Sequence, residues 1–290
     1  MKVQLTGASG FIGQNLTKLL KFECIQAKIS TTEPFKISAD IFIHLAGIAH
    51  NLDSKITSNQ YQTINTELTK KAFDAFLLSN AKIFILLSTV KAVRNESDSI
   101  ITEESIESPS TDYGRSKLQA EKYILSHDLP KDKLIYILRP ALITGPGVKG
   151  NMQRLYNFSN KSFNWFLSSI NNQRSFCNIL NLNFVIEQLI ERIDIPSGIY
   201  LLSDNETIST GEIVNELSIK GIKYKNLSIL SASFIIFLLK FDKFIGYTTI
   251  LSPLRTLASN YIISNKKITK ALGKSLPFTT LEGIRSLKEK

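Results

Sequence analysis

Tyr113 and Lys117 stand four residues apart, and this pairing of side-chain types could move a proton. On a helix, residues at this spacing lie on one face. An ammonium beside a phenol favours the phenolate, which lowers the phenol pKa from about 10. A phenol tuned in this way can take a proton from a substrate hydroxyl, or return one to it, near neutral pH. The pair therefore predicts acid–base chemistry at an oxygen of the substrate.

Ser88 and Thr89 add a second group to this chemistry. They follow Ile83–Leu87, an unbroken apolar run of the kind found in strands that are buried on both faces of a parallel sheet. Open α/β sheets bind ligands at the carboxyl ends of such strands. A hydroxyl there can hold the reacting oxygen, so we expect Thr89, Tyr113 and Lys117 to act together as the catalytic residues.

A glycine-rich turn near the start of the chain predicts a phosphate site. It follows a predicted strand, Met1–Thr6, and opens an amphipathic helix. Glycine permits the tight turn and lets the backbone approach a pyrophosphate, while the helix N-terminus offers unpaired N–H groups and a partial positive charge. This context favours a dinucleotide site over an ordinary strand–helix turn. The expected cofactor-binding residues of the turn are Gly7, Ser9, Gly10, Phe11, Ile12 and Gly13.

The adenine side of this predicted site is abbreviated. The acidic residue that usually follows about 20 positions later, on the adenosine ribose, is not clearly present. Lys28 follows the second predicted strand, Glu23–Ala27, and could accept a ribose 2′-phosphate, which leans towards NADP. Ser30–Asp40 is too short for a full helix and strand. The sequence leaves the cofactor open between NAD and NADP.

Short apolar runs alternate with longer helical patterns through the first two-thirds of the chain, which predicts an α/β fold with a parallel sheet covered by helices on both sides. The predicted strands are Met1–Thr6, Glu23–Ala27, Ile41–Ala46, Ile83–Leu87, Leu134–Leu138 (ended by Arg139-Pro140) and Ile199–Leu202. One helical stripe consists of Tyr61, Ile64, Leu68, Ala72, Ala75 and Phe76. We expect a dinucleotide-binding domain over 1–145, with later strand contributions near 175–202, and a smaller, mainly substrate-binding lobe over 146–290.

Composition limits the other classes of function. The net charge is +10, without a run of consecutive Lys or Arg, so a lysine-rich solvated surface is preferred to a nucleic-acid partner. Cys24 and Cys177 lack metal-ligand spacing, and no metal or disulfide is expected. The N-terminus lacks a signal-peptide core, and the apolar stretch Leu227–Leu239 is too short to span a membrane. A cytoplasmic protein is expected, and the sequence leaves open whether that stretch is core, a homodimer surface or a membrane contact.

Taken together, the motifs resemble the extended short-chain dehydrogenase/reductases, in particular the NAD-dependent epimerase/dehydratase family. The motifs that carry the resemblance are Thr6–Gly13, His44–Gly47, Ser88-Thr89, Tyr113–Lys117 and Arg139-Pro140, with Leu272-Gly273 and Leu281–Gly283 near the end. The resemblance implies a Rossmann-type doubly wound sheet with a smaller C-terminal lobe, NAD or NADP, a Thr–Tyr–Lys triad and a nucleotide-sugar substrate.

The resemblance also implies further site residues. Leu45, Ala46 and Gly47 would lie at the cofactor together with Lys117. The expected substrate-binding residues are Ser88, Thr89, Tyr113, Asn151 near a uracil, Arg174 on the substrate pyrophosphate and Arg255 as a second clamp. Arginine suits a pyrophosphate because its planar fork meets phosphate oxygens bidentately. Asn65 would support the Tyr–Lys pair or serve in the core.

Val90-Lys91 stands where dehydratases of this family place an Asp-Glu pair, so dehydration is disfavoured. Gly145–Met152 and Asn172–Phe176 are similar to a subgroup of UDP-glucose 4-epimerases and 4-keto reductases. The first hypothesis is a 4-epimerase that acts on a UDP-hexose or UDP-N-acetylhexosamine. The second is a UDP-4-keto-6-deoxy-sugar 4-reductase that uses NADPH. The third is a non-catalytic dinucleotide-binding protein with a macromolecular partner, which the intact triad disfavours.

Overall fold

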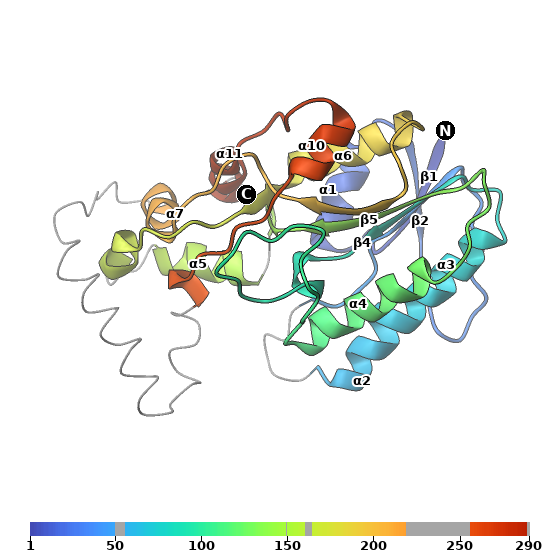
Figure 1. Cartoon of the computed structure of the whole chain (residues 1–290), viewed down its shortest axis with the longest axis horizontal. Coiled ribbons are helices and arrows are strands. Elements are labelled where there is room, and N and C mark those ends of the chain that lie inside the picture. The colour runs from blue at the N-terminus through green and yellow to red at the C-terminus, as the bar shows by residue number, and fades with distance from the viewer. Residues whose placement is uncertain (50–55, 149, 160–163, 219–255, 289–290) are drawn as a thin grey trace.

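The computed structural model describes residues 1–49, 56–148, 150–159, 164–218 and 256–288 (Figure 1). Its centre is a six-stranded parallel sheet with the strand order β2-β1-β3-β4-β5-β8. The strands are β1 (Lys2–Thr6), β2 (Glu23–Ala27), β3 (Ile41–His44), β4 (Ile83–Leu87), β5 (Leu134–Pro140) and β8 (Gly198–Leu202). Since β2 and β3 flank β1 on opposite sides, the winding of the sheet reverses there, and such reversal points form ligand crevices outside the carboxyl ends of the strands.

The inner strands are apolar because both of their faces are covered. Every residue of β3 and β4 is buried. This confirms the predicted α/β class with a doubly wound, Rossmann-type sheet. Two strands differ clearly from their predicted bounds: β3 ends at His44 and not at Ala46, and β5 continues through Arg139 and Pro140 instead of ending before them. Pro140 lies beyond the last residue of β5 that pairs with β4, and it pairs with Leu202 of β8.

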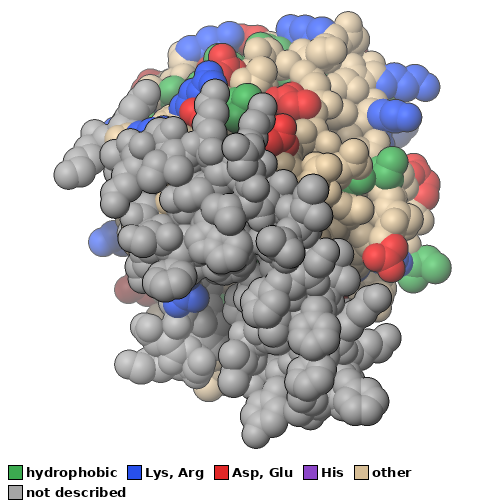
Figure 2. Space-filling view, turned by 90° about the vertical axis from the view of Figure 1, so that its left-hand side faces the viewer, with side chains coloured by type: hydrophobic (Ala, Val, Ile, Leu, Met, Phe, Trp, Pro, Cys, Tyr) green, Lys and Arg blue, Asp and Glu red, His purple; other side chains and the backbone are tan. Residues whose placement is uncertain are grey.

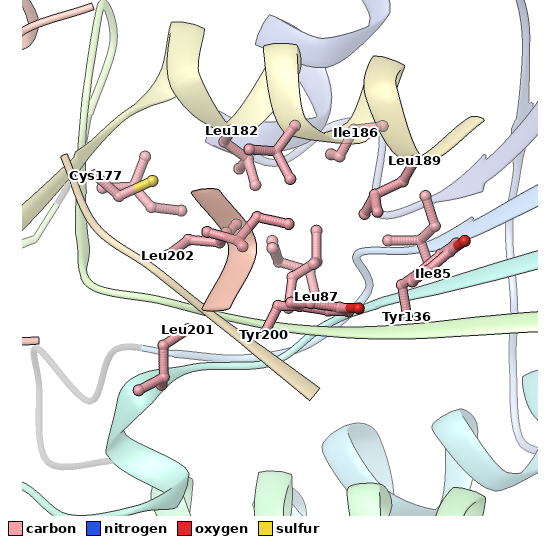
Figure 3. Close-up of a cluster of buried hydrophobic side chains, with 14 of the residues drawn as sticks. Ile85, Leu87, Tyr136, Cys177, Leu182, Ile186, Leu189, Tyr200, Leu201 and Leu202 are labelled. Carbon is pink, nitrogen blue, oxygen red and sulfur yellow. The ribbon is translucent and has the colours of Figure 1, made fainter. Parts of the chain in front are cut away.

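Helices cover both faces of the sheet (Figure 1). One face carries α1 (Phe11–Leu19), α6 (Ile179–Glu191) and α10 (Lys266–Leu272), and the other carries α3 (Leu68–Leu77) and α4 (Asp112–Leu125). Figure 3 shows the first interface, where side chains of α6 meet those of the central strands. Full burial of one such aliphatic side chain contributes roughly 1.5–3 kcal/mol. Two apolar cores therefore hold the strand ends, and the residues after them, in fixed positions.

A π-helical turn interrupts the helix that precedes α3. The helix begins as α2 (Ser58–Tyr61), passes through the π turn Gln62–Glu67 and continues as α3. The predicted stripe placed Ile64 in the core, but Asn65 is fully buried and Ile64 only partly. The wider turn shifts the side-chain register, because a π turn adds a residue to the helical repeat. An amide is thereby aimed at α4.

The connection between β2 and β3 contains neither a helix nor a strand over residues 28–40, as its length predicted. The buried side chain of Gln4 holds it from the neighbouring strand. The Gln4 amide donates to the Lys36 carbonyl at 3.0 Å and its oxygen accepts the Ser38 N–H at 2.8 Å. The side of the sheet beyond β1 is therefore covered by a loop.

A smaller apolar cluster lies beyond the carboxyl ends of the strands. Its elements are β6 (Leu142–Thr144), paired in parallel with β7 (Phe176–Asn178), and the helices α5 (Asn151–Ser159), α7 (Thr210–Leu217) and α11 (Thr280–Arg285), with 3₁₀ turns at Asn164–Ser169 and Ser286–Lys288. The chain crosses between this cluster and the sheet more than once, since α6, β8 and α10 return to the sheet. The domain boundary at residue 145 stays a prediction.

Asp204 joins the two parts of the chain. Its carboxylate accepts hydrogen bonds from the Asn178 N–H at 2.8 Å, the Asn181 amide at 2.7 Å and the Thr280 hydroxyl at 2.8 Å. Burial raises its pKa to about 6, against the lowering effect of these donors. One acidic group thus ties the end of β8 to the starts of α6 and α11.

In the part of the chain that the structure describes, none of the helices has the length and apolar character needed to cross a membrane. The stretch Leu227–Leu239 lies outside the described residues. The same described part contains no group of three or more His, Cys, Asp or Glu side chains placed to hold a metal ion. Figure 2 shows positive and negative side chains interspersed on the coloured part of one face.

Candidate active site

Thr89 and Tyr113 meet where the end of β4 contacts the start of α4. Thr89 caps the short 3₁₀ turn Val90–Ala92, and its hydroxyl oxygen accepts the Lys91 N–H at 3.2 Å. Gly114 rests directly on this turn, because a Cβ there would lie 2.4 Å from the Lys91 carbonyl oxygen. The close approach brings Tyr113, in the first turn of α4, into a hydrogen bond with the Thr89 side chain.

Lys117 lies one helical turn further along α4 and is buried. Its ammonium donates to the Leu87 carbonyl at 3.0 Å. On the other side it faces Gly47, where a Cβ would come within 3.3 Å of the Lys117 Nζ. Lys117 therefore lies between the end of β4 and the loop that follows β3, and the missing Cβ of Gly47 permits this close approach.

The pKa of Tyr113 differs in direction from the sequence prediction. Burial of the phenol is the largest cause and raises its pKa to about 12, while the hydrogen bond with Thr89 acts in the lowering direction. The predicted lowering of the pKa by Lys117 is wrong, since the groups that shift the pKa of Tyr113 do not include Lys117, whose ammonium donates to the Leu87 carbonyl. Tyr113 is consequently protonated at neutral pH in this structure.

Burial also shapes the charges beside the phenol. It lowers the pKa of Lys117 to about 8, and the charge of Glu121 opposes that shift. His44, fully buried at the end of β3, has a pKa lowered to about 3 by burial and by Lys117. Its Nδ1 lies 2.8 Å from the Thr6 hydroxyl oxygen. His44 is therefore neutral and structural, and Lys117 is the cation of this group near neutral pH.

Asn65 fastens the loop after β3 to α4. Its side-chain oxygen accepts the Ile48 N–H at 2.8 Å, and its amide donates to the Ile48 carbonyl and the Ser116 hydroxyl, both at 3.0 Å. The neighbouring Thr66 hydroxyl donates to the Ser116 carbonyl at 2.8 Å. Ser116 lies between Tyr113 and Lys117, so these contacts agree with a supporting role for Asn65.

The glycine turn has the shape expected of a phosphate cradle. Gly7 has a φ of +73°, and a Cβ there would lie 2.7 Å from the Ala46 nitrogen. A Cβ on Gly13 would lie 2.3 Å from the Gly7 oxygen. These two glycines are required by the turn itself. Gly10 is different, since it is exposed, caps α1 without a side-chain hydrogen bond, and a Cβ there would meet only the Gly7 oxygen, at 3.3 Å.

The N–H groups of the first turn of α1 therefore face outward with no side chain to cap them, which is the donor set that a pyrophosphate requires. The residues present fit a dinucleotide. Phe11 and Ile12 pack into the apolar clusters, so their backbone N–H groups are what they can offer. Ser9 is exposed in the turn, and Lys28 is exposed directly after β2.

The loop after β3 forms the other wall of the cradle. Leu45 packs against the first apolar core, and the Ala46 N–H donates to the Thr6 hydroxyl at 3.4 Å. Gly47 is exposed between this wall and Lys117. The structure thus brings the predicted residues of the two loops together at the carboxyl edge of the sheet.

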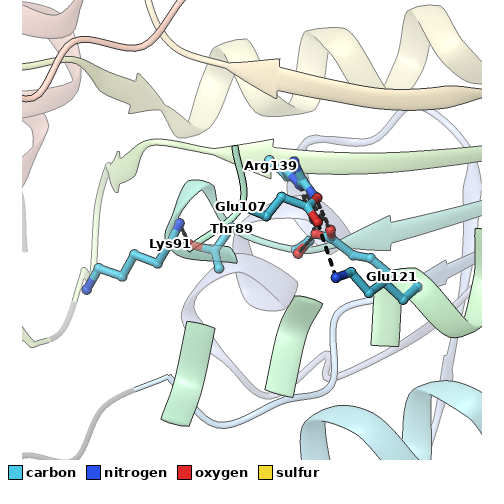
Figure 4. A network of polar contacts seen from close by, with 7 residues as sticks. Thr89, Lys91, Glu107, Glu121 and Arg139 are labelled. Carbon is cyan, nitrogen blue, oxygen red and sulfur yellow. Dashed lines mark hydrogen bonds and ion pairs between the residues drawn. The ribbon is translucent and has the colours of Figure 1, made fainter. Parts of the chain in front are cut away.

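Ser88 contacts a buried carboxylate of α4, and its predicted role at the substrate stays a prediction. Its hydroxyl donates to Glu121, a fully buried carboxylate on α4 (Figure 4). Arg139 of β5 holds the same carboxylate, with its Nε 3.0 Å from one Glu121 oxygen, and also binds Glu107. This hydrogen bond links the segment that carries Thr89 to α4.

The sequence reasoning missed Glu121, and it noted Lys91 only as part of the Val90-Lys91 pair that stands in place of an Asp-Glu pair. The signal for Glu121 was its place four residues after Lys117, on the same helical face. Figure 4 shows the Lys91 side chain extending away from the cluster of Glu107, Glu121 and Arg139. Lys91 is partly buried, and its pKa is lowered by burial and then by the charge of Arg174.

Arg174 precedes β7, in the smaller part of the structure. Its guanidinium donates to the Thr256 carbonyl and to the Ser259 carbonyl, the latter at 3.3 Å. Burial lowers its pKa, so the charged form is poorly solvated where it stands. Asn151 begins α5, but the placement of its side chain is not described, and Arg255 lies outside the described residues. Their predicted roles, like that of Arg174, stay predictions.

Known proteins share both the sequence pattern and the fold. Residues 22–182 match the model of the NAD dependent epimerase/dehydratase family. A UDP-glucose 4-epimerase from Vibrio cholerae is 30% identical over 251 residues, which cover 75% of each chain. A GDP-6-deoxy-D-talose 4-dehydrogenase from Aggregatibacter actinomycetemcomitans is 27% identical and covers 72% of this chain and 74% of its own.

Among solved structures, MoeE5 in complex with UDP-glucuronic acid and NAD superposes with a TM-score of 0.71 at 16% identity, covering 99% of this chain and 97% of that one. RMD from Pseudomonas aeruginosa complexed with NADPH gives a TM-score of 0.69 at 16% identity, with 99% and 98% covered. At these identities the structures establish the fold. Together with the matched residues and the 30% identical relative, they show that the chain belongs to the NAD-dependent epimerase/dehydratase family of the extended short-chain dehydrogenase/reductases.

Proposed function

We propose that the protein is an NAD(P)-dependent enzyme that acts at C4 of a UDP-hexose or UDP-N-acetylhexosamine, as a 4-epimerase. The observation that carries the proposal is the meeting of Thr89, Tyr113 and Lys117 beside Gly47, next to the cradle at the start of α1. The 30% identical UDP-glucose 4-epimerase supports the choice of UDP and of C4.

The chain's own residues supply the proton chemistry. When bound, the nicotinamide would exchange a hydride with C4. Tyr113 exchanges the proton of the C4 hydroxyl at its phenol oxygen, and Thr89, which already bonds the phenol, orients the same substrate oxygen. Lys117 is held at the Leu87 carbonyl and contributes its positive charge below a pH of about 8. The neutral phenol of the resting site must lose its proton before it can act as a base.

A 4-keto reductase is the second candidate, and Tyr113 favours it. A reduction needs a protonated phenol that gives its proton to the oxygen at C4, and the raised pKa of Tyr113 provides one. The exposed Lys28 directly after β2 could accept the 2′-phosphate of NADPH. The same residues would then run the chemistry in one direction only.

The two activities differ in how they treat the cofactor. An epimerase keeps its dinucleotide between the two half-reactions, whereas a reductase must exchange it. We therefore expect the purified protein to release stoichiometric NAD when it is denatured, as identified by mass spectrometry. We also expect the native protein to interconvert a UDP-hexose with its C4 epimer without added cofactor. Empty protein that oxidises NADPH with a UDP-4-keto sugar would overturn epimerisation in favour of the reductase.

A further inference from the structure

Lys91 is a cation with no role so far, and it stands next to the reacting group. It belongs to the 3₁₀ turn that Thr89 caps, and its carbonyl supports Gly114 of α4. Its backbone is therefore fixed by the same contacts that bring Thr89 and Tyr113 together. Its side chain, however, extends away from the buried carboxylates Glu107 and Glu121 (Figure 4).

A hydrogen bond brings the turn that holds Lys91 close to Arg174. The Tyr261 hydroxyl donates to the carbonyl of Arg94 at 2.7 Å, and Arg94 is itself bonded back to that turn, to the Val90 carbonyl. Tyr261 pairs with Arg174 through a β-bridge. The two cations thus approach one another from two parts of the structure. Lys91 comes from the turn that Thr89 caps, and Arg174 comes from the smaller cluster.

Neither cation is neutralised within the part of the chain that the structure describes. Neither Lys91 nor Arg174 takes part in an ion pair among the described residues. The guanidinium of Arg174 binds two backbone carbonyls instead. The positive charge of Arg174 acts on Lys91 and lowers its pKa, so it disfavours the charged form of Lys91. Two partly buried cations that repel one another lower the stability of the empty site, and an anion between them would reverse that effect.

We propose that Lys91 binds an anionic oxygen of the sugar-side (β) phosphate of the substrate, opposite Arg174. The inference rests on the proposed function, which supplies a substrate with one diphosphate. A diphosphate that runs from the sugar to the nucleoside must pass from the Thr89 side towards Arg174, so its sugar-side phosphate comes nearest to Lys91. In addition, two cations match the two charges of the diphosphate.

Binding of UDP and of UMP separates this role from a general electrostatic effect, because only UDP carries the β-phosphate. For Lys91→Met we expect calorimetric titration to show about a tenfold or greater rise in the Kd of UDP, the scale of a lost charge-assisted hydrogen bond. The Kd of UMP should change less than about twofold. Lys91→Arg, which keeps the charge, should retain most of the UDP affinity. Lys18→Met, an exposed lysine in the last turn of α1, is the matched control for net charge and should leave both values unchanged.

The other outcomes overturn the inference in distinguishable ways. Unchanged UDP binding in Lys91→Met, or an equal loss of UDP and UMP binding, removes the β-phosphate contact. A loss confined to UDP-glucuronate, with UDP and UDP-glucose unaffected, would place Lys91 on a sugar carboxylate instead. If wild-type protein fails to bind UDP at all, the nucleotide of the proposed function fails and this inference with it. Thermal unfolding of each variant checks that the fold is kept.

Discussion

At the scale of single residues, burial sets the resting protonation of the two groups at the centre of the site. It raises the pKa of Tyr113 to about 12 and lowers that of Lys117 to about 8. Both shifts favour neutral forms, since a charge loses solvation when it is buried. A positive charge placed beside the phenol would reverse the shift of Tyr113, and an oxidised nicotinamide carries one. Cofactor binding and phenol ionisation are therefore expected to be linked.

Tyr113→Phe tests the role of the phenol. We expect turnover to fall about a hundredfold or more, the usual effect of removing a proton-transfer group. Dinucleotide binding should survive because the ring remains to fill its place beside Tyr61, with the two rings 6.2 Å apart. Steady-state kinetics and cofactor titration of the same preparation provide the measurement. Tyr61→Phe is the matched control and should keep most of the activity, while near-normal turnover in Tyr113→Phe would remove the assigned mechanism.

The residues of the site were only partly predictable from the sequence. The positions of Thr89, Tyr113 and Lys117 followed from a strand end and a helical spacing, which are local patterns. The pKa direction of Tyr113 and the bond from Ser88 to Glu121 were not predictable, because both depend on which groups meet through space after packing. Lys91 was noted in the sequence because Val90-Lys91 stands in place of an Asp-Glu pair. That it lies close to Arg174 could be seen only in the folded structure.

At the scale of secondary-structure elements, apolar periodicity gave the strands almost completely. β2 and β4 have the bounds that the sequence predicted. Buried parallel strands are continuous apolar runs, so the six strands of the main sheet could be predicted without tertiary information, whereas the ends of β3 and β5 and the short strands β6 and β7 could not. The π turn at Gln62–Glu67 could not be foreseen in the same way, since its altered register is stabilised by contacts of Asn65 with Ile48 and Ser116, far along the chain.

Gly10→Val tests the start of α1 as a phosphate cradle. Gly10 has ordinary extended backbone, with φ −75° and ψ 168°, so valine can adopt it. Its side chain would stand where a pyrophosphate must approach the N–H groups. We expect NAD(P) affinity to fall more than about tenfold, which corresponds to about 1.4 kcal/mol, while circular dichroism and the Tm stay close to wild type.

Gly10→Ala adds only a Cβ and gives a graded control, with a smaller loss of affinity expected. A folded Gly10→Val protein that binds the dinucleotide as wild type does would show that the cradle is misassigned.

Asp204 provides a test at the junction of β8, α6 and α11. Asp204→Ala leaves buried donors on Asn178, Asn181 and Thr280 without their acceptor. An unsatisfied buried donor costs about 1–3 kcal/mol, so we expect a loss of at least that size in the free energy of unfolding, measured with urea. Asp204→Asn keeps one oxygen acceptor and should lose less. A stability loss for Asp204→Ala below about 0.5 kcal/mol, typical of a surface site, would contradict this role.

The stability of the wild type should depend on pH through Asp204. Burial raises the Asp204 pKa from 3.8 to about 6. The folded state therefore binds a proton at Asp204 more tightly than the unfolded state does. The stability gained from this proton is fully present below the pKa of Asp204 in the unfolded state, and it is lost as the pH rises through the pKa in the folded state. Relative to Asp204→Asn, the wild type should gain about 1 kcal/mol of stability between pH 7 and pH 5. A relative change of the opposite sign would mean that the hydrogen bonds outweigh burial.

At the scale of the whole molecule, the site is built from two parts of the chain that face one another. The sheet, with the turns and helices that follow its strands, supplies the cradle, the proton-transfer group and Lys91, whereas Arg174 comes from the segment before β7 and is held by carbonyls of residues 256 and 259. A substrate with a diphosphate in its middle could bridge the two parts. The affinity for the substrate would then depend on the smaller part of the structure, which carries Arg174. The affinity for the dinucleotide would depend on the sheet.

Arg174→Ala should separate these two dependencies. Losing a charge-assisted bond to phosphate costs about 1.5–3 kcal/mol, so UDP should bind roughly ten- to a hundredfold more weakly. NAD(P) binding should change little, because the cradle lies at the start of α1. Arg174→Lys should restore only part of the affinity, since lysine lacks the bidentate fork and cannot serve both the carbonyls and the phosphate as arginine does.

Calorimetric titration of UDP and of NAD(P) into the wild type and both variants measures the separation. Because Arg174 also holds the Thr256 and Ser259 carbonyls, the Tm of each variant shows whether the segment stays in place. A parallel loss of UDP and NAD(P) affinity would indicate damage to the fold and not to one site. UDP binding to a folded Arg174→Ala protein as tight as to the wild type would mean that the substrate diphosphate is held elsewhere, because a partly buried guanidinium bound to a phosphate cannot be removed without effect.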